Sequence, residues 1–279
     1  MFNLLSGEFY KLKKSKSLLV CCVITAVFVL VLYGMLMIVD KVRRGEIENG
    51  TGGIIYVSGE EVDENAKSLF DEITVMEVLR QMFCSFGSFA TAVFAAIFVI
   101  GEYINGAAKN IVGKGYARWQ IFLAKYIVVM ASAVLQLLVL SAVAIICGAV
   151  VEGTEQFDAV FWKNFFGYIG IQILLGMAFV GVVSAVSEIC RNLAAGISIG
   201  IGLVCFSSPL TMGMDLLAKL LFSQAEWKPS DFWLLDLASQ CPVRDIRKGF
   251  AVHSIIVALI WVIFAAAVGI VHIRKADIK

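Results

Sequence analysis

The residues best suited to chemistry lie in one polar stretch, residues 101–125. It holds a single carboxylate, Glu102, and four basic residues. The bases are Lys109, Lys114, Arg118 and Lys125. Its opening letters, GEYING, resemble a glycine-rich phosphate loop, but Ala107 and Ala108 stand where such a loop needs a Lys and a Ser or Thr. The chain therefore cannot hydrolyse ATP through this stretch.

Catalytic and metal-binding patterns are missing from the rest of the sequence. The only histidines, His253 and His272, lie at the ends of the last apolar segment, and no HExxH motif or Cys/His cluster occurs. The seven cysteines have no CxxC spacing, and most lie in or beside apolar segments, as small hydrophobic residues do. We expect no catalytic residue, no metal and no bound cofactor, which disfavours an intramembrane enzyme. A net charge of +1 gives no reason to expect nucleic-acid binding.

Hydrophobic segments occupy most of the 279 residues. The chain is 60% hydrophobic and 16% charged, and about 25% charged is usual for a soluble domain. Six segments contain no Asp, Glu, Lys or Arg, and a helix needs about 20 residues to cross the ~30 Å bilayer core. These segments are residues 18–39, 82–100, 126–151, 165–187, 194–210 and 251–273. They predict an all-α, multi-pass membrane protein in which residues 1–279 form one domain.

The charges of the connecting segments predict the orientation. With the N-terminus inside, the inner segments hold 12 basic and 4 acidic residues, and the outer segments hold 11 basic and 18 acidic residues. The inner segments are 1–17, 101–125, 188–193 and 274–279, and the outer ones are 40–81, 152–164 and 211–250. Basic residues concentrate on the cytoplasmic side of membrane proteins. We therefore expect both termini in the cytoplasm and the protein in the plasma membrane.

The N-terminal segment has the pattern of an amphipathic helix. Apolar residues recur at helical spacing, and the basic residues lie mostly off that stripe. The apolar positions are Phe2, Leu5, Phe9 and Leu12, and the basic ones are Lys11, Lys13, Lys14 and Lys16. Residues 1–17 are therefore predicted to form an interfacial helix on membrane lipid.

The fifth span is the shortest, and its apolar character continues past Pro209 through residue 222. An aromatic pair, Phe232 and Trp233, follows in the same outer segment. This part of the chain is predicted either to lie in the outer interface or to re-enter the bilayer between spans five and six.

Residues 101–125 are more than a positive anchor. Basic residues alone would set the orientation, but they do not explain Glu102 or the glycines at 106, 113 and 115, which would end short helices. A carboxylate at the membrane boundary requires a partner, and either Arg118 or a helix N-terminus in the same loop could supply one.

Three patches of sequence resemble a known family. The first is EFYKLKKSK, beginning at Glu8, and the third is RKADI, beginning at Arg274. The second and most specific runs from Phe98 through Glu102 and Tyr103 to Gly106, Lys109, Arg118 and Lys125. Together with length and span number, they resemble the permease subunits of ABC-2 type transporters, including small permeases found with lantibiotic or bacitracin resistance systems. One departure is the Gly115-to-Arg118 stretch, where relatives often carry Pro-x-Ser-Arg.

The resemblance implies a permease domain whose loop between spans two and three forms a cytoplasmic coupling helix. The residues that match the coupling pattern are Glu102, Tyr103, Gly106, Lys109, Lys114 and Arg118. The implied partners are a cytoplasmic ABC ATPase, which would bind ATP and Mg²⁺, and a second permease subunit of the same or a related chain. The chain would then be the transport subunit of an exporter without an ATPase site of its own.

The cargo is inferred from the residues of the spans and loops. Spans without full charges suit an amphipathic peptide or lipid-like cargo better than a small ion. Acidic outer loops suit a cationic peptide and favour a role in antimicrobial-peptide resistance. The alternative function, from a different class, is a membrane sensor or scaffold that binds a ligand without moving cargo.

Overall fold

A computed structural model of the chain describes residues 1–43, 75–104, 111–151, 153, 157–221, 228–243 and 246–275. All regular elements within these residues are helices, which confirms the all-α prediction. Six of the described helical segments are long and apolar enough to cross a membrane. They are Lys16–Val39, Val75–Ile104, Arg118–Val151, Ala159–Cys190, Leu193–Leu221 and Lys248–Lys275. Each predicted span lies within one of them.

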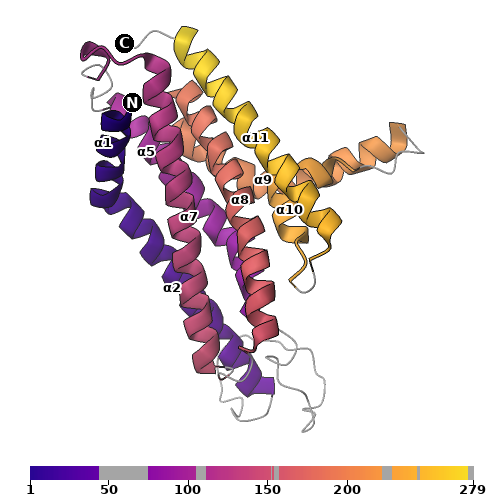
Figure 1. Cartoon of the computed structure of the whole chain (residues 1–279). Coiled ribbons are helices and arrows are strands. Elements are labelled where there is room, and N and C mark those ends of the chain that lie inside the picture. Colours follow the sequence, from indigo (N-terminus) through magenta and orange to yellow (C-terminus); the bar gives the residue numbers. More distant parts are fainter. Residues whose placement is uncertain are drawn as a thin grey trace.

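The helices follow one another in a bundle (Figure 1). The first span is α2 (Lys16–Arg43), and the third is α7 (Arg118–Val151). The second span consists of α4 (Val75–Met82), the π-helix η1 (Phe83–Gly87) and α5 (Ser88–Ile104). The others are α8 (Ala159–Cys190), α9 (Leu193–Leu221) and α11 (Lys248–Lys275). Outside the spans are α1 (Phe2–Lys14), the 3₁₀-helix η2 (Pro229–Phe232) and α10 (Leu234–Gln240).

Helix α8 forms the centre of the bundle. It packs against α5, α7, α9, α10 and, most extensively, α11. Its most apolar 18-residue window is 61% buried, whereas the corresponding windows of α2 and α9 are 17% buried. In Figure 1, α1 and the last turn of α11 lie at the same end of this bundle.

The N-terminal helix α1 packs against α7 through a face that differs from the predicted stripe. Its buried residues are Leu4, Glu8 and Leu12, whereas Phe2 is 88% exposed and Phe9 is 40% exposed. Phe2 and Phe9 of the predicted stripe therefore face away from the bundle. Glu8 faces the bundle, and the ammonium group of Lys11 pairs with the Glu8 carboxylate. An interfacial position on lipid stays a prediction.

Helical structure extends into the predicted inner loop at both ends. Helix α5 continues to Ile104, and α7 begins at Arg118, so both ends of residues 101–125 are helical. The side chain of Gln120 accepts a hydrogen bond from the main-chain nitrogen of Ala117, 3.3 Å away, just before α7. Gly115 has a φ of 87°, in the left-handed region that glycine adopts without strain. The turn before Arg118 is thus built on glycine rather than proline.

The apolar stretch after Pro209 belongs to α9, which continues through this proline to Leu221. Side chains on several sides of this part are exposed, among them Leu210, Met212, Leu217 and Leu220. Figure 1 shows the end of α9 projecting from the bundle. Re-entry between spans five and six stays a prediction.

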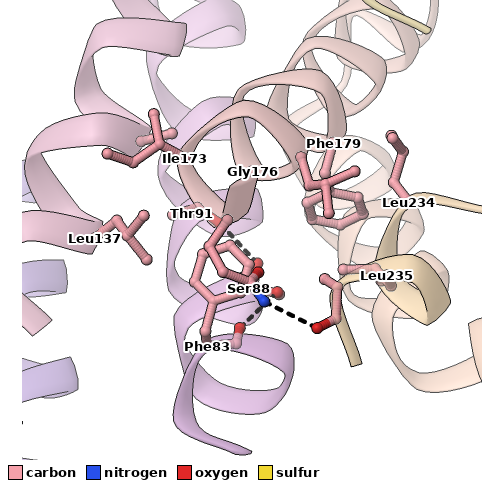
Figure 2. Close-up of a pocket in the computed structure, with 13 residues that line it drawn as sticks. Phe83, Ser88, Thr91, Leu137, Ile173, Gly176, Phe179, Leu234 and Leu235 are labelled. Atoms are coloured by element: carbon pink, nitrogen blue, oxygen red, sulfur yellow. Dashed lines mark hydrogen bonds between the residues drawn. The ribbon is translucent and has the colours of Figure 1, made fainter. Parts of the chain in front are cut away.

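The segment that follows packs into the bundle. Helix α10 is buried from Leu234 to Ala238, and Gln172 on α8 donates a 2.9 Å hydrogen bond to the main-chain oxygen of Ala238. Figure 2 shows a small cavity beside this contact, lined by residues that include Phe83, Ser88 and Leu235. Its volume of about 10 Å³ is room for about one water molecule.

Candidate functional site

The end of α5 carries a carboxylate held between two lysines from other helices. Glu102 forms ion pairs with Lys11 on α1 and with Lys125 on α7, the latter at 2.9 Å. The Lys125 side chain is 1% exposed, and its ammonium group also donates to the main-chain oxygen of Val99 at 3.4 Å. Removing one ion of a buried pair costs about 3–5 kcal/mol, so these contacts fix three helix ends together.

A second carboxylate extends the cluster into α1. Glu8 is 1% exposed, and its side chain lies 2.7 Å from the Lys11 ammonium group. Burial, together with the Glu102 charge, raises the pKa of the Glu8 carboxyl above its ordinary value of 4.5, although Lys11 opposes this. Burial lowers the pKa of Lys11, but its bonds to Glu102 and Glu8 outweigh that effect and raise the pKa above 10.5.

Tyr103 links the same end of α5 to α8. Its hydroxyl donates to the carboxylate of Glu188, which is fully buried near the end of α8. Its ring lies below the Lys125 ammonium group, 4.6 Å from the centroid, and the Arg191 guanidinium carbon is 5.1 Å from that centroid. Arg191 also lies 3.8 Å from Glu188. Cation–π contacts and ion pairs therefore continue from α1 to α8.

We call these seven residues the ion cluster: Glu8, Lys11, Glu102, Tyr103, Lys125, Glu188 and Arg191. It contains three carboxylates and three cations, so its charges balance. Balanced charges in contact hold elements in position; they leave no excess charge to bind an ionic ligand. Within the described ranges, no group of three or more His, Cys, Asp or Glu residues could hold a metal ion.

The structure brings some of the predicted site residues together. Glu102, Tyr103 and Lys11 belong to the ion cluster, whereas Lys114 is exposed in the turn before α7 and Arg118 is half-buried at the start of α7. Gly106 and Lys109 lie outside the described residues. The expected partner of Glu102 was Arg118 or a helix N-terminus, but the ion pairs that the structure gives this carboxylate are with Lys11 and Lys125. The remaining N-terminal lysines, Lys13, Lys14 and Lys16, are exposed.

Sequence reasoning missed four members of the cluster: Glu8, Lys125, Glu188 and Arg191. Glu188 and Arg191 are the only charged residues in the short connection between the fourth and fifth spans, which was a usable signal. Lys125 and Glu8 belonged to the patches that resemble the family, but nothing in the sequence indicated that their side chains are buried.

Comparison with known proteins adds a decisive observation to this geometry. The model of a family described as ABC-2 family transporter protein matches residues 4–207, which include most of α1, the ion cluster, the first four spans and the first half of the fifth. The chain belongs to this family. A search of curated proteins gives no match to the sequence.

Membership of the ABC-2 family makes the chain a permease, the membrane component of a transporter. Permeases of this family generally have no ATPase site of their own, and the family implies a partner ABC ATPase. Six apolar helices agree with a multi-pass membrane location. The matched residues end within α9, so residues 211–250 and α11 lie beyond the match.

Proposed function

We propose that this ABC-2 permease is the membrane subunit of an ATP-driven exporter and that the ion cluster couples it to its ATPase. The observation that carries the proposal is the double ion pair of Glu102 with Lys11 and Lys125. It joins α1, α5 and α7 beside the connection between the second and third spans. A force on that connection would act on all three helices at once.

The coupling step would use the two helices that flank the connection. Helix α5 enters it at Ile104 and α7 leaves it at Arg118, so docking of an ATPase there would shift both helix ends. The hydrogen bond between Tyr103 and Glu188 would pass that shift to α8, the centre of the bundle. Closure of the ATPase subunits would thereby favour one state of an alternating-access equilibrium.

Substitution of Glu102 tests this role. Glu102→Gln removes the charge but keeps the size, so transport driven by the ATPase should fall at least about tenfold while membrane insertion and ATPase binding persist. Arg118→Ala should also uncouple hydrolysis from transport if this residue docks on the ATPase. Glu77→Gln is the matched control, because Glu77 lies at the opposite end of the same span. Full transport by the Glu102 and Arg118 variants would contradict the coupling role.

A second permease subunit, identical or related, would complete the transporter. Helices α2 and α9 are the spans with the most exposed surface, and lipid or that second subunit would cover them. The oligomeric state of the purified chain in lipid nanodiscs, with and without the ATPase, tests for a homodimer.

An amphipathic peptide or lipid-like molecule is the cargo that the spans suit best. The polar residues of the third and fourth spans include Ser132, Gln136, Gln172 and Ser184. All four are buried, and three of them bond within the bundle, for example Ser184 to the main-chain oxygen of Val180 at 2.7 Å. Of these three bonds, the one from Gln172 joins two helices, and the two serine bonds lie within single helices. ATPase stimulation of the reconstituted transporter by peptides, lipids or Na⁺ would identify the cargo, and stimulation by Na⁺ alone would contradict an amphipathic one.

Resistance to a cationic antimicrobial peptide is the role that the acidic outer loops favour. Four of their acids, Glu60, Glu61, Asp63 and Glu64, lie outside the described residues. Neutralising them together should lower resistance to a cationic lantibiotic, more so at low salt, and leave resistance to an uncharged amphiphile unchanged. Equal loss for both agents would assign the loops a structural role.

The alternative function is a membrane sensor or scaffold that moves no cargo. Family membership favours transport, and an ATPase gene beside the gene of this chain, or an ATPase that co-purifies with it, would separate the two. A chain that binds an ATPase but never stimulates cargo movement would fit the alternative.

A further inference from the structure

A recess between the last outer segment and α11 is lined by groups that suit an organic cation. Its volume is about 420 Å³, and small-molecule sites usually measure about 300–1,000 Å³. Its described lining residues are Asp231, Phe232, Leu237, Gln240, Phe250 and His253. All six lie beyond residues 4–207, so family membership assigns nothing to this recess.

The charged and polar groups around the recess present hydrogen-bond acceptors. Nε2 of His253 lies 2.8 Å from the main-chain oxygen of Asp231, and a carbonyl oxygen only accepts, so Nε2 carries the hydrogen. In a neutral ring, Nδ1 is then left as an acceptor. The Asp231 carboxylate makes no hydrogen bond or ion pair with another residue in the part of the chain that the structure describes. A ligand that donates hydrogen bonds or carries positive charge would satisfy both groups.

Aromatic and apolar side chains form the rest of the lining. The ring of Phe232 is 48% exposed and stands edge-on to His253, with ring centroids 5.5 Å apart. Phe250 and Leu237 supply further apolar surface. An ammonium or guanidinium group is attracted to aromatic faces as well as to a carboxylate, whereas an anion is repelled by both. The apolar side chains would hold the body of such a ligand.

Three helices hold the walls of the recess in place. The indole nitrogen of Trp261 on α11 donates to the main-chain oxygen of Phe232 at 2.9 Å. Asp215 on α9 accepts from the main-chain nitrogen of Ser230 at 2.9 Å, and Gln172 on α8 donates to Ala238. These bonds fix the main chain of the lining segment, so binding of a ligand would cost little conformational entropy of that segment.

We infer that this recess binds an organic ammonium or guanidinium group attached to an apolar body, with Asp231 as its counter-ion. The site stands independently of the coupling role proposed above, because no residue of the ion cluster contributes to it. Its chemistry is shared by a soluble amine and by the choline headgroup of a lipid.

Binding to the purified full chain tests the inference. The probe is benzyltrimethylammonium, compared with neutral benzyl alcohol and anionic benzenesulfonate, in a detergent with an uncharged sugar headgroup. Trp233 and Trp261 lie next to the recess in an edge-to-face arrangement, with ring centroids 5.5 Å apart. Tryptophan fluorescence should therefore report binding. The cation should bind at least about tenfold more tightly than either comparison compound. If a phosphocholine detergent competes with the probe, the natural ligand is a lipid headgroup. If it does not compete, the natural ligand is a soluble amine.

Two substitutions with opposite expected effects on the affinity for the cation complete the test. Asp231→Asn should weaken binding of the cation at least about tenfold, and Gln240→Glu, which adds a carboxylate at the exposed rim, should tighten it. A misfolded protein cannot give the second result. Asp158→Asn is the matched control: it removes one exposed carboxylate elsewhere, and Asn still caps α8 as Asp158 does. Equal binding of the three compounds, no effect of Asp231→Asn, or an equal loss in Asp158→Asn would overturn the inference.

Discussion

Glu102 shows how single residues organise one end of this permease. It is the last acidic residue of its span, and lysines from α1 and α7 neutralise it from two sides. A chain with so few charges keeps three nearly inaccessible ones, Glu8, Lys125 and Glu188, in the same place. Buried charges are retained when each has a partner, so we expect the cluster to respond as a unit to loss of one member.

The raised pKa of Glu8 gives a pH-dependent prediction. The folded protein holds the Glu8 proton to a higher pH than the unfolded chain does, so the contribution of this group to stability is fully present below about pH 4.5 and declines as the pH rises through the folded pKa. Glu8→Gln resembles the protonated state at every pH. The melting temperature of the variant minus that of the wild type should therefore be more positive at pH 8 than at pH 4.5.

Thermal unfolding in detergent between pH 4.5 and 8 measures this difference. Asp158→Asn, which neutralises an exposed carboxylate elsewhere in the chain, is the matched control. A melting-temperature difference between Glu8→Gln and the wild type that grows toward acid pH would contradict the predicted direction.

At the scale of elements, glycines allow several helices to approach closely. A methyl group at Gly269 on α11 would overlap the ring of Phe122 on α7, and this ring is 1% exposed. Because the ring has no room to move, Gly269→Ala should lower the free energy of unfolding by about 1–3 kcal/mol. Gly170→Ala is the control, since nothing lies within 4 Å of a methyl group there. Chemical or thermal unfolding of both variants checks the contrast, and equal stabilities would show that α7 and α11 separate freely.

Helix α10 is joined to α8 by a hydrogen bond from Gln172 as well as by apolar packing. Gln172→Leu keeps the approximate shape but removes the bond to Ala238, leaving a buried carbonyl unpaired at a cost of about 1–3 kcal/mol. Cys241 ends this helix, is fully buried, and has a thiol whose pKa is raised by burial to about 12. Maleimide should therefore label Cys241 slowly in the wild type and at least several-fold faster in the variant.

Mass spectrometry of the peptide that contains Cys241 gives the labelling rate. Ser132→Ala serves as the control, because Ser132 bonds within its own helix to Val129. Unchanged labelling in Gln172→Leu would mean that apolar packing alone holds α10 in place.

At the scale of the whole molecule, the charge asymmetry predicts which end of the bundle faces the cytoplasm. Helix α1 and the last turn of α11 lie at one end of the bundle (Figure 1), and the segments predicted to face the cytoplasm together hold 12 basic and 4 acidic residues. An impermeant thiol reagent added to intact cells should label cysteines introduced at Glu60 or Glu155. It should not label Lys114→Cys until the cells are opened, and labelling at that position in intact cells would reverse the orientation.

Local properties of the sequence determined the spans, the all-α class and the existence of α1. Uninterrupted hydrophobicity over about 20 residues is a local signal, and only a helix satisfies its main chain in a bilayer. The glycines near residue 115 likewise indicated a break, and the structure has a turn there. Helix ends were less predictable: Lys125 reads as a loop charge, yet it lies inside α7 because a partner on another helix neutralises it.

The partners of the buried charges were decided by tertiary structure alone. Lys11 and Glu102 are 91 residues apart, and Tyr103 and Glu188 are 85 apart. The same is true of the recess, whose aromatic, carboxylate and imidazole groups come from two separate elements. Hydropathy and charge patterns describe each helix by itself, but which faces meet depends on the packing of all six spans. The composition therefore indicates a membrane bundle, and only the packing shows which residues can work together.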